Sequence, residues 1–351
     1  MKRVRTVVVE VALVALALLS TLGVSEFLFS RNDGFVVPRP EGSRTYDPAM
    51  RFGVAAGSQP NFAFRWGPDG NGPLHIRSSD PVLLYEMRPS TRLNDVIATN
   101  AAGFRDREFA MPKPSGVRRI VVIGDEITFA HDLRPEQSYP KIIEVMLNGR
   151  PELTAGVRFE VLNMGVTGYN AEQEGELVKT KALALQPDML LVQFNVDDNT
   201  IGDVDGIFQH FFLSSPLHTW DYIRLQIRQW RPERSAYALL EPFYAELARI
   251  HRGGLPVLVA LFPPRFDQFS SIQRQRELCE RLGLPYVDMT AAFQAAGLER
   301  AVATSNCPNA LGHRLAAVAI HRSMRAMGGP LFTDLKQTPE PAAGVESTHS
   351  K

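Results

Sequence analysis

Acidic side chains follow two predicted strands of this chain. Gly124-Asp125-Glu126 comes directly after a short β-branched run, so Glu126 lies at the turn from a strand into a helix. Asp197 and Asp198 follow a second apolar run. Carboxylates that converge raise one another's pKa, act as a general acid and base pair, or recruit a cation. Glu126 and Asp197 are therefore the candidates for acid-base chemistry or for a divalent-metal site.

A late polar segment runs from Thr304 to His313 and contains Cys307 and Asn309. A cysteine thiolate can act as a nucleophile, but no histidine is evident as its partner, so a small apolar filler is the favoured role for Cys307. His313 is expected to pack or to cap a helix. The nearest other polar candidates, beyond Glu126, are His131 and Asp132.

In order and spacing these segments resemble the motif blocks of the SGNH (GDSL-type) hydrolases, which read Gly-Asp-Ser, Gly-x-Asn-Asp and Asp-x-x-His-Pro-Asn. The resemblance covers about residues 97 to 327. The four working positions of that family are occupied here by Glu126 for Ser, Asp197 for Asn, Thr304 for Asp and Cys307 for His. The segment Asn163 to Asn170 resembles a further block, and this implies that Gly168 supplies an oxyanion-hole amide; a glycine also lets the backbone approach a ligand closely.

The resemblance implies a fold more firmly than an activity, because the working residues are the ones that differ. Glu126 cannot attack as a serine would, and an ionised Asp197 accepts hydrogen bonds where an asparagine donates them. One hypothesis is a pseudoenzyme that binds a glycan, an acyl group or a protein partner at the cell surface. The alternative is a hydrolase with a rebuilt carboxylate or metal site acting on acylated polysaccharide or lipid. A standard serine esterase is disfavoured, and Glu126 as a mere capping carboxylate remains an alternative.

The candidate binding positions share a place at the carboxyl ends of predicted strands or in the retained motif frame. They are Asp125, Glu126, Gly168, Asp197, Asp198 and Asn309. No cofactor is indicated other than a divalent cation at Glu126 and Asp197. Lysine and arginine together balance aspartate and glutamate at 38 each, which argues against a nucleic-acid partner.

Strand and helix patterns alternate from residue 119 onward, which predicts an α/β, flavodoxin-like parallel sheet of about five strands with helices on both faces. The predicted strands are 120–123, 159–162, 189–194, 256–262 and 286–288, and the predicted helices are 138–147, 171–184, 235–251, 272–282 and 310–326. Ligands bind such sheets beyond the carboxyl ends of the strands. Cys279 and Cys307 are expected at opposite edges of the sheet, and hence not bridged.

Basic Lys2, Arg3 and Arg5 precede an apolar run from Val7 to Phe29. The length and charge pattern predict a single-pass anchor over residues 1–30, with its N-terminus cytoplasmic and the main domain exported; a cleaved signal is the alternative. Residues 31–96 read as a loop-rich stalk or lead-in without a core of its own, and 97–327 as the main domain. Residues 203–234 form an aromatic insertion, and 328–351 are predicted to be a disordered tail.

Overall fold

The computed structural model describes residues 72–80, 82–83, 85–93, 96–149, 156–194, 236–263, 269–302 and 307–328, together with residues 20 and 23. Several predictions lie outside these ranges: nearly all of the anchor, the aromatic insertion, the tail after residue 328, and the site positions Asp197, Asp198 and Thr304. Within the described ranges, no helix combines the length and the apolar content needed to cross a bilayer.

Five parallel strands form the central sheet, in the order β4-β3-β5-β6-β7. This is the flavodoxin-like order 2-1-3-4-5 when the strands of the sheet are counted along the chain, so the predicted fold class is confirmed. The strands are β3 (Val117–Gly124), β4 (Arg158–Gly165), β5 (Met189–Phe194), β6 (Val257–Leu261) and β7 (Tyr286–Asp288).

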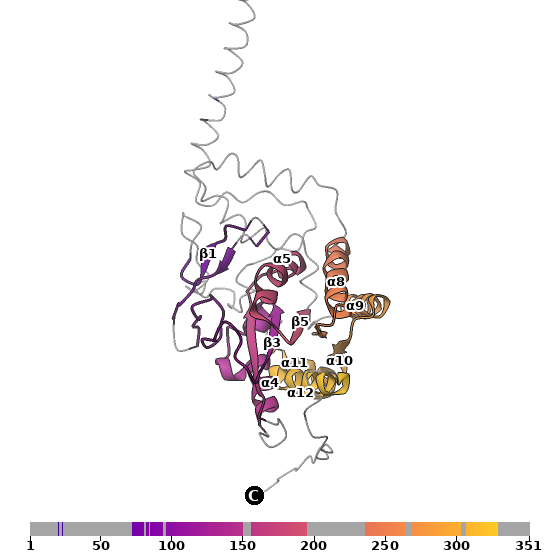
Figure 1. The fold of residues 1–351 in the computed structure, drawn as a ribbon. Helices are drawn as coiled ribbons and strands as arrows, with labels where there is room; N and C mark the ends of the chain where they lie inside the picture. Colours follow the sequence, from indigo (N-terminus) through magenta and orange to yellow (C-terminus); the bar gives the residue numbers. More distant parts are fainter. Residues whose placement is uncertain are drawn as a thin grey trace, which may run out of the picture.

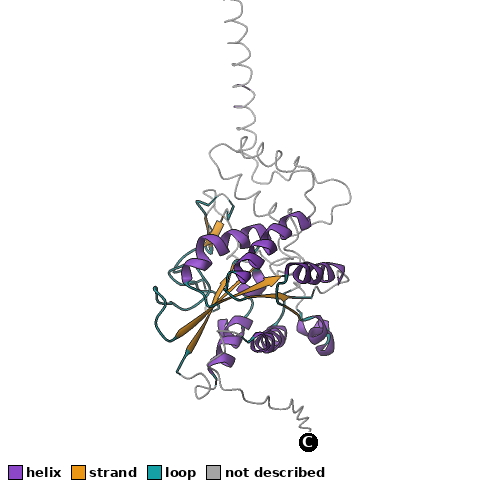
Figure 2. Cartoon of the chain, turned by 45° about the vertical axis from the view of Figure 1, so that its right-hand side comes forward, coloured by secondary structure: helices purple, strands orange, loops and turns teal. Residues whose placement is uncertain are grey.

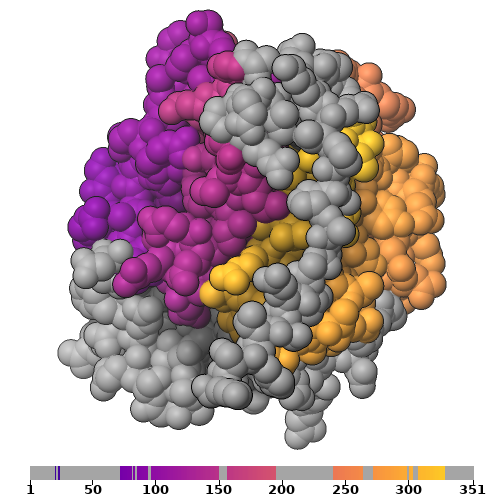
Figure 3. Space-filling model, turned by 90° about the horizontal axis from the view of Figure 1, so that it is seen from below, coloured from indigo at the N-terminus to yellow at the C-terminus, as the bar shows by residue number. Residues whose placement is uncertain are grey.

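Helices cover both faces of the sheet (Figure 2). Within β3, Val121 and Ile123 belong to one core cluster, whereas Ile120 and Val122 belong to the other. A strand buried on both faces reads as a continuous apolar run, which is the pattern seen in the sequence. One face carries α5 (Ala171–Leu177), α8 (Ala236–Arg252) and α9 (Phe269–Leu282), and the other carries α4 (Tyr139–Asn148) and α12 (Ala310–Met327). In the space-filling view, α12, in yellow, runs between the magenta region of α4 and β4 and the orange region of α9 to α11 (Figure 3).

The lead-in packs on the domain. β1 (His75–Arg77) and β2 (Tyr85–Met87) pair antiparallel and lie near α5 (Figure 1). Leu74, Leu83 and Tyr85 are buried in the same cluster as the core of the sheet. Residues of the lead-in therefore complete the main core, since three-residue strands cannot build one alone.

Helical structure differs from the sequence prediction in two places. The helix predicted over residues 171–184 ends at Leu177, and the chain continues as a π-helical turn (Val178–Ala182) and a 3-10 turn (Leu183–Leu185). Two further helices were not predicted: α10 (Thr290–Ala296) and α11 (Leu298–Ala301). Cys279 and Cys307 are both buried and do not form a disulfide, as predicted.

Candidate functional site

The turn after β3 brings the predicted site residues to the carboxyl edge of the sheet. Asp125 caps α3 (Glu126–Phe129), since its Oδ1 accepts a hydrogen bond from the Ile127 N–H at 2.8 Å. Gly124 is required here because a Cβ would lie 2.2 Å from Thr128 Oγ1. The helix is a single turn, so its dipole contributes little. Asp125 is thus the capping carboxylate, and the side chain of Glu126 is available for a different contact.

Glu126 meets the amide that the sequence assigned to the oxyanion hole. The Gly168 N–H donates to Glu126 Oε2 at 3.1 Å, and the Glu126 residue is only 3% exposed. The two residues lie 42 positions apart in the chain and come from the ends of adjacent strands, β3 and β4. A carboxylate oxygen of the chain itself therefore accepts the hydrogen bond of the Gly168 N–H.

The loop that carries Gly168 is held by the lead-in hairpin. The Tyr85 hydroxyl donates to the Thr167 carbonyl at 2.8 Å, and His75 Nε2 lies 2.8 Å from Thr167 Oγ1. Burial lowers the pKa of His75 to about 3, so this imidazole is neutral. Gly168 has φ +79°, a conformation that favours glycine.

A third carboxylate, from Glu174 on α5, faces the same edge. Glu174 is 1% exposed, and its Oε1 is buried without a hydrogen bond from any described residue. Burial, followed by the charges of Asp125 and Glu126, raises the pKa of Glu174 well above its usual value. Sequence reasoning missed Glu174 because a glutamate inside a helical pattern ordinarily faces solvent.

Arg105 binds the backbone at and just after the end of α3. Its buried guanidinium donates to the carbonyls of Phe129 at 2.6 Å and Ala130 at 2.9 Å, and it also reaches the Leu133 carbonyl. These carbonyls lie at the end of α3, where helical hydrogen bonds run out. Burial lowers the pKa of Arg105 to about 10, which leaves it charged at neutral pH. The sequence analysis did not assign Arg105 a role in the site.

Residues 307–313, the described part of the segment from Thr304 to His313, pack in the core or cap a helix. Asn309 Oδ1 accepts from the Leu311 and Gly312 N–H groups and so caps α12. Cys307 is buried. His313 stacks on Tyr139, with the ring centroids 5.8 Å apart, and its Nδ1 accepts from the Tyr139 N–H. Burial, with a contribution from the positive charge of Arg105, lowers the pKa of His313 to about 3, and this imidazole packs in the core, the role favoured by the sequence.

Two other sequence candidates can be placed. His131 Nε2 lies 3.2 Å from Asp132 Oδ2, and the Asp132 side chain is 58% exposed. Among the described residues, no group of three or more histidine, cysteine, aspartate or glutamate side chains is arranged to hold a metal ion. Asp197, the second predicted ligand of a divalent cation, lies outside the described residues.

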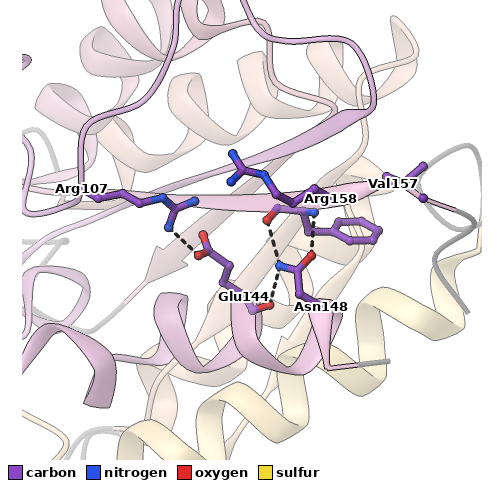
Figure 4. A pocket seen from close by; sticks show the side chains of 7 residues that line it. Arg107, Glu144, Asn148, Val157 and Arg158 are labelled. Carbon is purple, nitrogen blue, oxygen red and sulfur yellow. Dashed lines mark hydrogen bonds and ion pairs between the residues drawn. The ribbon is translucent and has the colours of Figure 1, made fainter. Parts of the chain in front are cut away.

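A surface hollow of about 380 Å³ lies at the opposite end of the sheet, beside the start of β4 (Figure 4). Its polar groups cover the edge strand. The Asn148 amide exchanges two hydrogen bonds with the Phe159 backbone, at 2.9 and 3.0 Å, and Glu144 Oε2 accepts from the Val161 N–H at 2.7 Å. Arg107 pairs with Glu144. Side chains that satisfy an exposed edge protect it from pairing with another chain, which accounts for this arrangement without a ligand.

Searches of family models and of curated proteins found no match to this chain. Solved structures do match. An α/β hydrolase enzyme, LAE5, from the metagenome of Lake Arreo, Spain, is 19% identical with a TM-score of 0.43, over 60% of this chain and 96% of that one. A two-domain esterase (CEX) active on acetylated mannans is 18% identical with a TM-score of 0.41, over 64% of this chain and 53% of that one.

A putative GDSL-like lipase from Parabacteroides merdae is 17% identical with a TM-score of 0.41, over 59% of this chain and 95% of that one. The sheet order, and the position of Glu126 and Gly168 after adjacent strands, match the expectation from the sequence blocks. The described domain is thus an α/β domain with a five-stranded parallel sheet in the flavodoxin-like order.

Proposed function

We propose that this chain is a membrane-anchored pseudoenzyme of SGNH fold, which binds a ligand beyond the carboxyl ends of β3 and β4 without ordinary ester hydrolysis. The observation that carries this proposal is the hydrogen bond from the Gly168 N–H to the buried carboxylate of Glu126. Ester hydrolysis by such a site needs a nucleophile at position 126 and a free donor for the oxyanion. Glu126 stands where the nucleophile would be, and its carboxylate accepts the hydrogen bond of the Gly168 N–H that an oxyanion would need.

Charge determines which ligands suit this edge. Asp125, Glu126 and Glu174 lie close enough for the first two to raise the pKa of the third. A tetrahedral oxyanion would meet like charge there, whereas a hydroxyl-rich sugar or a basic group would find hydrogen-bond acceptors. Membrane-anchored proteins of the resembled family often act in acylation or deacylation of cell-surface polysaccharides. A glycan or an acylated cell-surface polymer is therefore our favoured ligand class, ahead of a protein's basic group.

The exported location rests on the sequence of residues 1–30. The basic residues before the apolar run predict that the N-terminus stays cytoplasmic and that the domain lies outside the membrane. Protease added to intact cells whose outer layers have been made permeable should then cleave the domain. Protection equal to that of a cytoplasmic marker would contradict the anchor.

A second candidate is an enzyme that uses carboxylates as acid and base. The observation in its favour is Glu174, because burial and the charges of Asp125 and Glu126 raise the pKa of its carboxyl group. General acid-base catalysis needs one group that donates a proton and another that accepts it, and a raised pKa suits Glu174 to the first role. This candidate predicts turnover that depends on both Glu126 and Glu174.

Turnover of short-chain aryl esters by the full chain separates these candidates. The wild type should remain at the uncatalysed rate, as should Glu126→Ala, whereas the revertant Glu126→Ser, Asp197→Asn, Thr304→Asp, Cys307→His should exceed it. The exposed Glu136 provides a matched control as Glu136→Ala. Wild-type turnover that Glu126→Ala abolishes and Glu136→Ala retains would overturn the pseudoenzyme proposal; loss in Glu174→Gln as well would establish the second candidate.

A further inference from the structure

Both ends of one peptide unit are occupied at the candidate site. The Thr167 carbonyl accepts from the Tyr85 hydroxyl at 2.8 Å, and the N–H of the same peptide, that of Gly168, donates to Glu126 Oε2 at 3.1 Å. The C=O and N–H of a trans peptide point in opposite directions. The two hydrogen bonds therefore fix the plane of this peptide, with its donor end toward the site.

The Thr167–Gly168 peptide needs such a constraint. Gly168 has φ +79°, and glycine adopts positive and negative φ with similar ease. Its own backbone thus does not prevent the peptide from reversing. Reversal would turn the N–H away from Glu126, and would present a carbonyl oxygen to a carboxylate. It would also break the hydrogen bond from Tyr85.

Tyr85 is itself rigidly placed. It is 1% exposed, and its carbonyl accepts from the Tyr169 hydroxyl at 2.5 Å. Its ring meets those of Tyr169 and His75 edge-on, with centroids 5.3 and 5.5 Å apart. His75 in turn contacts the Thr167 hydroxyl group. The hairpin thus contacts both the carbonyl and the side chain of Thr167.

We propose that Tyr85 is a positioning residue, which holds the Gly168 N–H toward the ligand site, and that the β1–β2 hairpin is consequently part of that site. The proposal rests on the proposed function, because it takes the Gly168 N–H as the donor of the site. A hydrogen bond accepted by a peptide carbonyl also polarises the N–H of the same peptide, so that it donates more strongly. Tyr85 therefore both aims the donor and strengthens it.

The sequence allows this one peptide to be observed alone. Thr167–Gly168 is the only Thr-Gly pair in the chain. Full chain labelled with ¹³C at threonine carbonyls and ¹⁵N at glycine, in detergent micelles, therefore gives a single carbonyl-coupled amide signal. The carbonyl shift reports the hydrogen bond from Tyr85, and the amide shift and exchange rate report the hydrogen bond to Glu126.

Tyr85→Phe should shift both nuclei upfield and make exchange of the Gly168 amide roughly 5- to 10-fold faster, the change expected for loss of one buried hydrogen bond. Tyr139→Phe is the matched control, because it removes an equally buried hydroxyl, one that contacts Thr128 Oγ1 at 2.7 Å. It should leave the signal in place. A signal that Tyr85→Phe does not move would overturn the proposal.

Glu126→Gln distinguishes this failure from failure of the proposed function. It weakens the acceptor and should move the amide signal of Gly168. If it does not, the Glu126 contact, and with it the proposed function, is wrong. If Glu126→Gln moves the signal and Tyr85→Phe does not, only the role of Tyr85 fails. Should Tyr85→Phe not fold, wild-type chain containing 3-fluorotyrosine, a stronger donor, must shift the Thr167 carbonyl in the opposite direction; an unchanged shift again overturns the proposal.

Discussion

Buried charged side chains are arranged differently at the two ends of the parallel strands, which are called here the amino-terminal edge and the carboxyl edge of the sheet. At the amino-terminal edge, Arg119 and Glu160 sit opposite each other on β3 and β4, at 0% and 2% side-chain exposure, with Arg119 Nη2 2.9 Å from Glu160 Oε2. Asp188 nearby accepts from the Arg119 backbone N–H and from Lys113, each at 2.6 Å. Both carboxylates named here, those of Glu160 and Asp188, are paired with a cation.

At the carboxyl edge, acids gather instead. Glu174 is buried beside Asp125 and Glu126, and the two charges add to burial in raising its pKa. An arrangement that opposes ionisation is unfavourable for stability, and perturbed carboxylates cluster where proteins bind or react. The comparison teaches that the carboxyl edge holds a buried acid whose ionisation its neighbours oppose, whereas at the opposite edge each acid named is paired with a cation.

Breaking the compensated pair should produce the largest effect. Glu160→Leu leaves the Arg119 guanidinium buried without its carboxylate, and we expect a loss of about 3–5 kcal/mol in the free energy of unfolding. Urea denaturation measures it. Arg119→Met combined with Glu160→Leu should recover most of the loss, because no charge then remains buried.

Arg158 supplies the control for this pair, because it contacts the same Glu160 carboxylate from the surface and its side chain is 61% exposed. Arg158→Ala should cost less than about 1 kcal/mol. Equal losses for Glu160→Leu and Arg158→Ala would show that burial does not set the cost at this edge.

Removing Glu174, the buried acid at the carboxyl edge, should increase the free energy of unfolding above pH 5, whereas breaking the Arg119–Glu160 pair decreases it. Because the folded pKa of Glu174 lies above its unfolded value near 4.5, the folded state keeps the proton to higher pH. The contribution of Glu174 to the free energy of unfolding is therefore greatest below pH 4.5 and falls as pH rises toward its folded pKa, by up to about 1.4 kcal/mol per pH unit. Glu174→Gln removes this fall, so its stability relative to wild type should increase from pH 5 to pH 7.

Urea denaturation at several pH values tests the Glu174 prediction. Glu172→Gln is the matched control, because Glu172 lies on the same helix and is exposed. Its pH dependence should follow that of wild type. Parallel curves for wild type and Glu174→Gln would mean that Glu174 is ionised in the folded protein, and that the carboxyl edge carries no such strain.

The sequence predicted the strands and the positions that follow them better than it predicted where the helices end. Apolar runs such as Met189–Phe194 gave strand positions, because a parallel strand buried on both faces must be apolar throughout. The motif blocks also placed Glu126 and Gly168 beyond the carboxyl ends of predicted strands, whereas the hydrogen bond between them was not predicted. The end of α5 at Leu177 was missed because a buried apolar pattern fits α-helical and π-helical turns alike.

Long-range contacts account for the other omissions. Glu174 looks like a surface residue until the packing of α5 is known, and Tyr85 belongs to a strand of three residues, too short to predict with confidence from alternation. The carbonyl acceptors of Arg105 lie 24 and 25 positions later in the chain. Such roles depend on tertiary structure, which spacing along the chain does not specify.

Neutralising Glu126 should produce the smallest effect and tests whether the acids act together. Glu126→Gln retains an oxygen that can accept from the Gly168 N–H but removes one of the charges that raise the pKa of Glu174. The folded pKa of Glu174 should then fall, and the free energy of unfolding should rise by about 1 kcal/mol or less at pH values above that pKa. In the Glu174→Gln background the same change should lose this pH-dependent gain, because no titrating partner remains. Were the gain equal in both backgrounds, the charge of Glu126 would not reach Glu174, and the contrast between the two edges would reduce to the burial of a single acid.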